Sequence, residues 1–208
     1  DLREAGARGT RAAMHYAFGV HLNPEPCELS ADYLVRHLKA FFCLYEWILK
    51  VGDIDFSRRI TPYINHFDQD YIIKVLDESY QPTMPELIKD YLEANPTRNR
   101  SLDMLPMFTY IDEELVRSVV DDDRINARPT FHYRLPNCEI DNPTWNLKRS
   151  IELWMAVEEL AGDEQLNAIC AEYSKKLNSL FSGLGSDWVE RLEELLPLPD
   201  PKSAELGS

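Results

Sequence analysis

The feature that most constrains the fold is a helical stretch, residues 31–50, that is apolar on nearly every side. Ser30 is a suitable N-cap residue, and Asp32 stands in the first turn, where the helix dipole favours an acid. A helix without a polar face is buried on several sides, so we predict that this stretch is the central packing helix. Its large apolar residues are Leu34, Val35, Leu38, Phe41, Phe42, Leu44, Tyr45, Trp47, Ile48 and Leu49.

Further helices are predicted after this stretch by apolar spacing and by their start signals. One begins at Asp68, and the next begins after Thr83 with Pro85 in its first turn, where proline is tolerated, and ends at Asn95. The remaining helices are expected at about 112–120, 145–160, 163–181 and 187–196.

Residues 14–24 alternate strictly between two kinds of side chain, which is the pattern of a strand that packs one face on a core. Pro24 ends the stretch, because proline has no N–H to donate to a sheet. The second face is free of Lys and Glu, so we interpret the strand as the floor of a binding site. The alternative is an ordinary strand with a structural histidine. The apolar face holds Met14, Tyr16, Phe18, Val20 and Leu22, and the other holds His15, Ala17, Gly19, His21 and Asn23.

Residues 128–140 form a second predicted strand of the same design. Phe131, Tyr133 and Leu135 share its apolar face. Its other face carries Thr130, His132 and Arg134. If the two strands belong to one sheet, polar side chains from both would converge, and we expect Arg98 and Arg100 to approach them from the loop 95–100. The expected cluster is His15, His21, Asn23, His132, Arg134, Arg98 and Arg100.

Composition limits the classes of partner and the compartment. A formal net charge of −14 argues against nucleic acid or an anionic membrane surface as the main partner. No apolar run reaches 18 residues and no signal peptide is visible, so we expect no membrane span. Cysteines 27, 43, 138 and 170 show neither a CxxC pair nor a disulfide framework, which favours reduced thiols in a cytoplasm.

Four arginines stand out in this acidic chain as candidates for binding a small anion. Arginine is the side chain best suited to bidentate recognition of a carboxylate or a phosphate. Pairing with local acids is the alternative for each single arginine. The sequence has no Walker A, GxGxxG or HExxH motif. The four candidates are Arg98, Arg100, Arg128 and Arg134.

Three sequence blocks together resemble the amidoligase family, which belongs to the carboxylate–amine ligase superfamily with glutamine synthetase and glutamate–cysteine ligase. The resemblance covers about residues 9–196. The blocks are FGVHLNP at 18–24, NPTRNR at 95–100 and RPTFHYRLPNCEI at 128–140.

The resemblance implies a reaction and a set of site residues. Members of the carboxylate–amine ligase superfamily use ATP and Mg²⁺ to convert a carboxylate into an acyl phosphate, which an amine then attacks. By this match Gly19, His21 and Asn23 would line the nucleotide and metal site. Arg134 would contact phosphate or substrate. His132 stands where the family commonly has Glu. Arg128 and His132 join Arg134 as catalytic candidates, Arg98 and Arg100 join the nucleotide-binding set, and Glu139 joins His21 as a metal candidate.

The resemblance also marks a departure at the start of the chain. The family's sheet normally opens with a strand of Glu-x-Glu metal ligands, and no such strand precedes His15. Either those ligands lie on a part absent from this chain, or the chain is not a complete enzyme.

The expected fold is α+β: a curved, mostly antiparallel sheet with helices on one face, as in glutamine synthetase, and a helical C-terminal part. We expect residues 1–143 to form the sheet-and-helix domain, 144–196 its helical part and 197–208 a disordered tail. The favoured function is ATP-dependent ligation of a small-molecule or peptide carboxylate to an amine. The first alternative is a non-catalytic binding or assembly module that keeps the cleft. The second is a hydrolase that uses His21 and Cys138.

Overall fold

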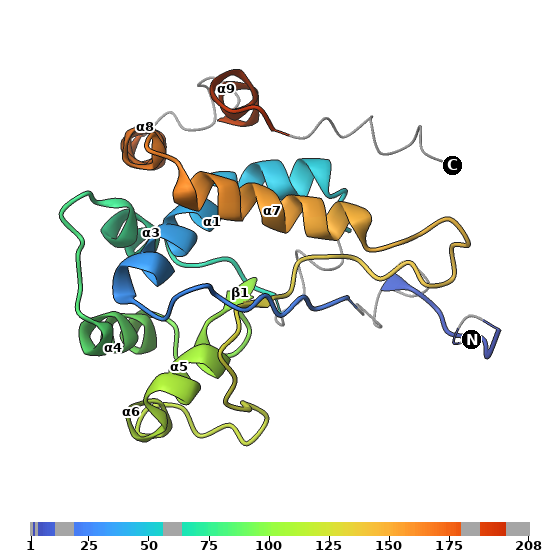
Figure 1. Cartoon of the computed structure of the whole chain (residues 1–208), viewed down its shortest axis with the longest axis horizontal. Helices are drawn as coiled ribbons and strands as arrows, with labels where there is room; N and C mark the ends of the chain where they lie inside the picture. The colour runs from blue at the N-terminus through green and yellow to red at the C-terminus, as the bar shows by residue number, and fades with distance from the viewer. Residues whose placement is uncertain (1, 3, 11–18, 56–63, 180–187, 199–208) are drawn as a thin grey trace. The chain divides into compact units, whose positions relative to one another are not determined.

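The computed structural model describes the chain except for residues 1, 3, 11–18, 56–63, 180–187 and 199–208 (Figure 1). The described residues form eight helices and one small antiparallel sheet, so the mixed helix-and-sheet class is confirmed. They divide into two compact units, each made of three stretches of chain. Unit 1 is 1–30, 54–67 and 82–146, and unit 2 is 31–53, 68–81 and 147–208. No helix of the described residues is long and apolar enough to cross a membrane.

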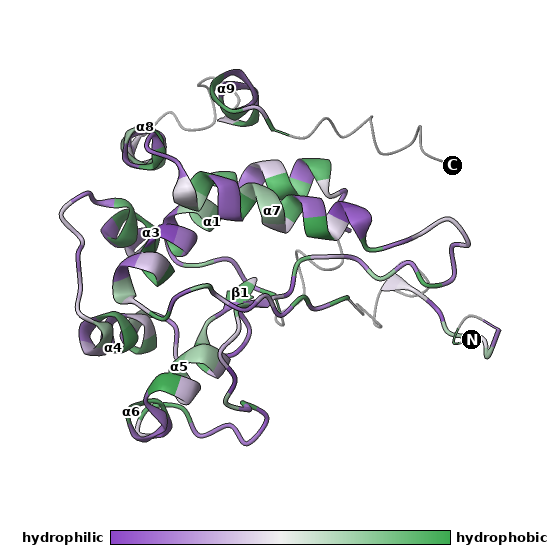
Figure 2. Ribbon diagram, in the orientation of Figure 1, coloured by the Kyte–Doolittle hydropathy of each residue, from purple (hydrophilic) through white to green (hydrophobic). Residues whose placement is uncertain are grey.

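Unit 2 is built around α1 (Ala31–Val51), the helix that the sequence predicts to be central. Helices α3 (Gln69–Leu76), α7 (Lys148–Gly162), α8 (Leu166–Asn178) and α9 (Trp188–Leu195) all contact it. Its large apolar side chains are buried except for Tyr45 and Leu49, which are half-buried, and this confirms the predicted packing role. Along α7 hydrophobic and hydrophilic residues alternate around the helix, as Figure 2 shows, so that one face can pack on α1.

Unit 1 holds α4 (Met84–Ala94), α5 (Leu105–Ile111) and α6 (Glu113–Arg117). The predicted start of α4 is confirmed, because the Glu86 carboxylate accepts a hydrogen bond from the backbone N–H of Thr83 and closes the first turn. The helix predicted at 112–120 ends earlier, at Arg117, and the preceding helix α5 was not predicted. Its buried apolar residues pack in the core of this unit.

The backbone pairing of unit 1 joins four segments side by side. Strand β1 (Leu102–Asp103) pairs antiparallel with β2 (His132–Tyr133), with Asp103 opposite His132. Leu22 forms an antiparallel bridge to Tyr133 from the other side. A parallel bridge between Asn65 and Arg100 adds the last segment. The order across the unit is therefore 19–24, 131–137, 100–103 and 65.

The predicted strands pair as expected, but their regular parts are short. The bridges Leu22–Tyr133 and Gly19–Asn137 are three residues apart on one segment and four on the other, so an extra residue bulges there. Residues 130–137 are all buried, so the polar side chains of this stretch are inside unit 1 together with the apolar ones. The predicted positions Met14, His15, Tyr16, Ala17 and Phe18 lie outside the described residues.

Candidate functional site

The pairing of 19–24 with 131–137 brings two histidines into contact in unit 1. Nδ1 of His21 lies 3.1 Å from Nε2 of His132. Their ring centroids are 4.8 Å apart and the rings meet edge to face at 76°. His132 is buried, whereas His21 is exposed. The predicted approach of His21 to the second strand is confirmed at this point.

A buried carboxylate completes the contact on the other side of His132. Because Asp103 stands opposite His132 in the β1–β2 register, its Oδ2 lies 3.2 Å from Nδ1 of that ring. Its Oδ1 accepts a hydrogen bond of 3.0 Å from the N–H of Leu105 at the start of α5. Asp103 is only 1% exposed, and a charge buried this deeply requires partners of this kind.

Arg134 is the cation of the polar cluster that His21, His132 and Asp103 form. Its Nη1 lies 4.0 Å from Oδ2 of Asp103 and donates a 2.9 Å hydrogen bond to the carbonyl of Arg98. Burial lowers the pKa of Arg134, and the nearby Asp103 opposes that shift. Arginine stays protonated despite such a shift. The predicted meeting of Arg134 with the loop 95–100 is therefore confirmed through a backbone contact.

Tyr91 of α4 lies against this cluster through its hydroxyl group, which accepts a 3.1 Å hydrogen bond from the N–H of Met104. Burial, and then the charge of Asp103, raise the pKa of Tyr91. The hydroxyl is therefore neutral at physiological pH and acts as a fixed dipole beside the buried ion pair.

Arg100 and Arg128 are placed differently from Arg134. Arg100 donates to the carbonyls of His66 at 2.5 Å and Ala94 at 3.4 Å, and its guanidinium lies over the ring of Phe67. These contacts fix the loop backbone. Arg128 is half-buried, and its N–H donates to the carbonyl of Pro106.

The remaining predicted residues differ in burial and in their contacts. Gly19 forms the bridge to Asn137, and Asn23 is exposed. The guanidinium of Arg98 reaches the carbonyl of Arg124 at 3.5 Å. Glu139 and Cys138 are half-buried. His132 is held by Asp103 and His21. The convergence of several arginines on one anion stays a prediction.

A resident magnesium site does not fit the residues that the structure describes. Mg²⁺ prefers carboxylate oxygens and water in octahedral geometry. In the described ranges no group of three or more His, Cys, Asp or Glu side chains lies close enough together to hold a metal ion. Asp103, the carboxylate of the cluster, is already bound by Leu105, His132 and Arg134.

Asp103 is the residue of this cluster that the sequence prediction missed. It stands as a single acid inside the apolar run from Leu102 to Phe108. An acid in such a run is buried with its neighbours, and a buried acid needs a cationic or hydrogen-bonding partner. That pattern is the signal that could have identified it.

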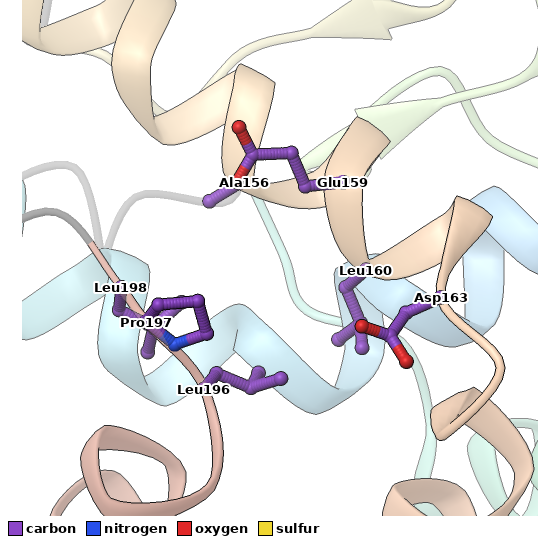
Figure 3. Close-up of a pocket in the computed structure, with 7 residues that line it drawn as sticks. All are labelled: Ala156, Glu159, Leu160, Asp163, Leu196, Pro197 and Leu198. Carbon is purple, nitrogen blue, oxygen red and sulfur yellow. The ribbon is translucent and has the colours of Figure 1, made fainter.

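A cavity of about 110 Å³ lies in unit 2 and is a separate feature. Its walls come from α7 and from the segment that follows α9 (Figure 3). This volume is well below the roughly 300 Å³ at which ligand pockets begin, so the cavity cannot hold a nucleotide. The lining residues are Ala156, Glu159, Leu160, Asp163, Leu196, Pro197 and Leu198.

The geometry of unit 1 thus defines a polar cluster in which a buried ion pair supports an exposed histidine. The family model described as "Putative amidoligase enzyme" matches residues 1–156 and includes the whole cluster. The chain belongs to this amidoligase family, which supports a ligase function. Neither the curated proteins nor the solved structures contain a match to the chain.

Proposed function

We propose that the chain is an ATP-dependent carboxylate–amine ligase that forms an amide bond through an acyl phosphate. Family membership supports this proposal, because the matched residues 1–156 contain His21, Asp103, His132 and Arg134. The single observation that carries it is the position of Arg134, a buried guanidinium held against the loop 95–100 in that matched region.

The reaction places several negative charges in one place. A carboxylate oxygen attacks the γ-phosphorus of ATP, the bond to ADP breaks, and the acyl phosphate forms. The amine then attacks the acyl carbon, and inorganic phosphate leaves with the electron pair of the C–O bond. Fixed cations stabilise such developing charge because they need no reorganisation during the reaction.

Arg134 and Arg98 are the proposed sources of this positive charge. The Arg98 carbonyl orients Arg134, and the charge of Arg98 is close enough to contribute to the lowered pKa of Arg134. Two guanidinium groups in one region favour binding of an anion between or beside them. Magnesium enters this proposal with ATP as the Mg–ATP substrate.

A non-catalytic binding module is the second candidate. It is favoured by the absence of a metal-binding group among the described residues and by the way Asp103, His132 and Arg134 satisfy one another. Such a module would bind the anion without turning it over.

Trapping with hydroxylamine separates these two candidates. The chain is incubated with Mg–ATP, hydroxylamine and each of the twenty amino acids as a carboxylate donor. A ligase yields an amino acid hydroxamate and an equal amount of ADP, whereas a binding module yields neither.

Arg134→Lys and the control Arg191→Lys in α9 show whether the activity belongs to this cluster. We expect the rate of hydroxamate formation to fall at least about tenfold in the first variant. Lysine cannot reproduce the planar, forked geometry with which arginine binds a carboxylate or a phosphate. The control should leave the rate unchanged. Equal rates in both variants would show that Arg134 is not part of the active site.

A further inference from the structure

Two buried thiols meet in unit 2, where α8 packs on α1. Sγ of Cys43 lies 3.8 Å from Sγ of Cys170, although the two cysteines are 127 positions apart in the sequence. Both are free thiols, and each residue is 0% exposed. Unit 2 thus contains a dithiol whose two sulfurs are in contact inside the helix packing.

Two positively charged side chains of α1 act on this dithiol. Lys39 is buried four positions before Cys43, on the same face of the helix, and its Nζ donates to the carbonyl of Asp77 at 3.0 Å. Arg36 donates to two backbone carbonyls at the C-terminal end of α7. These acceptors are neutral, so the contacts do not cancel the positive charges.

The two thiols differ in how readily they ionise. Burial raises the pKa of Cys43. The hydrogen bond that Cys43 donates lowers the pKa of Cys170, against the effect of burial. The charges of Lys39 and Arg36 act in the same direction as this hydrogen bond. Because the thiolate is the nucleophile in cysteine chemistry, Cys170 is the member of the pair that reacts first.

We propose that Cys43 and Cys170 form a redox site at which a hydroperoxide closes a reversible disulfide between α1 and α8. This inference goes beyond the ligase reaction and does not depend on it. Packing alone would be served by a small apolar side chain at either position. It does not explain why two sulfurs meet beside buried positive charge.

The oxidation has two steps. The Cys170 thiolate attacks one oxygen of hydrogen peroxide, the O–O bond breaks, and hydroxide leaves and becomes water, which makes Cys170 a sulfenic acid. The sulfur of Cys43 then attacks the sulfur of Cys170, the S–O bond breaks, and a second water leaves with the proton of Cys43. In total the two thiols lose two electrons and two protons, and one peroxide becomes two waters. A dithiol reductant reverses the bond by thiol–disulfide exchange.

Burial of the pair determines how the reaction must be measured. A disulfide bond is about 2.05 Å long, so the sulfurs must approach by roughly 1.8 Å, and α8 must move for peroxide to reach them. The exposed Cys27 needs no such movement and can be oxidised as well. The assay therefore has to locate the bond, because a count of lost thiols would not distinguish these sites.

Peptide mapping of the full chain locates the bond. The reduced chain is treated with hydrogen peroxide, its remaining thiols are alkylated, and it is digested with trypsin without a reductant. Cys43 lies on the tryptic peptide 40–50 and Cys170 on the tryptic peptide 150–175. We expect the two peptides to be joined, with a mass two hydrogen atoms below their sum. Dithiothreitol should separate them.

Matched serine variants test which thiol reacts first, since serine keeps a hydrogen-bond donor at the replaced position. In Cys43→Ser, peroxide should leave a sulfenic acid on Cys170, which dimedone traps. In Cys170→Ser, the amount of dimedone trapped on Cys43 should be at least about tenfold lower. The control Cys27→Ser should form the joined peptides in the wild-type yield.

The bond should also raise the thermal stability of the chain. It joins positions 127 residues apart, and a crosslink restricts the unfolded chain more when the loop it closes is long. The melting temperature of peroxide-treated Cys27→Ser should therefore fall by at least about 5 °C when dithiothreitol is added. Dithiothreitol leaves oxidised methionine in place, so the difference reports the disulfide. Cys170→Ser should show no such fall.

The peptide map also gives the result that would overturn the proposal. Peptides 40–50 and 150–175 that are recovered only as separate alkylated species, from a chain whose Cys27 is oxidised, would show that the buried pair is inert. A disulfide that joins either cysteine only to Cys27 or Cys138 would overturn it as well.

Discussion

Nε2 of His132 lies 3.1 Å from Nδ1 of His21, although 111 residues separate the two histidines in the sequence. The contact arises because Leu22 pairs with Tyr133 and so sets the segment 19–24 beside β2. On its other side, His132 meets Asp103 through the β1–β2 register. One buried ring thus joins the core of unit 1 to its surface.

Asp103 is expected to contribute strongly to the stability of unit 1. Asp103→Ala leaves the buried Arg134 without its carboxylate, and breaking a buried ion pair costs about 3–5 kcal/mol of unfolding free energy. The exposed Asp121 is the control, and Asp121→Ala should change the unfolding free energy by less than about 0.5 kcal/mol. Urea denaturation measures both. A loss below about 1 kcal/mol for Asp103→Ala would contradict the role of this pair.

Glu158 and its neighbour Glu159 on α7 provide a matched pair in unit 2. Glu158 accepts hydrogen bonds from Trp154 Nε1 at 2.7 Å and lies 2.8 Å from Nε2 of the buried His37. Glu158→Gln should lower the unfolding free energy by about 1–3 kcal/mol, because hydrogen bonds to a charged carboxylate become weaker hydrogen bonds to a neutral amide. Glu159 is exposed, so Glu159→Gln should be nearly neutral. Equal effects in thermal or urea unfolding would show that the contacts of Glu158 add nothing.

His66 makes stability depend on pH. Burial, and then the positive charge of Arg100, lower the pKa of His66 from its ordinary value of 6.5 to about 3. The unfolded chain therefore binds more protons between these values. The unfolding free energy should fall as the pH is lowered from about 6.5 towards 3, by up to about 1.4 kcal/mol per pH unit from this residue.

His66→Gln tests this dependence, since glutamine does not titrate. The variant should show a shallower fall of the unfolding free energy between pH 6 and 4 than the wild-type chain. Circular dichroism during urea titration at several pH values gives the two slopes. Parallel slopes in the two proteins would show that His66 titrates alike in the folded and the unfolded chain.

Mg–ATP is expected to bind weakly to the isolated chain. Asp103 is held by its protein partners, and the described residues contain no group of three metal-binding side chains. Isothermal titration calorimetry should give a dissociation constant near the millimolar range, about −4 kcal/mol. Micromolar, magnesium-dependent binding would show that carboxylates elsewhere in the chain hold the metal.

The sequence predicted the parts of the structure that depend on local patterns. The apolar stretch at 31–50 became α1, and Thr83 with Pro85 marked the start of α4, since side-chain spacing and capping act within a few residues. The approach of His21 to 128–140 was also expected, because both segments alternate.

Which residues lie opposite one another in the sheet could not be predicted in the same way. Strand β1 is two residues long, too short for a periodic signal, so the placement of Asp103 opposite His132 depends on a register that only the folded unit fixes. The bulge between Tyr133 and Asn137 has the same origin. All four cysteines lie in the described part of the chain and none forms a disulfide, as the spacing indicated.

Transfer of labelled oxygen tests the acyl phosphate most directly. The carboxylate donor that gives the highest hydroxamate yield is labelled with ¹⁸O in its carboxyl group and incubated with Mg–ATP and ammonium. Mass spectrometry then measures the label in the products. One ¹⁸O atom should appear in each inorganic phosphate, in an amount equal to the amide and the ADP formed. Unlabelled phosphate, or AMP carrying the label, would contradict the proposed reaction.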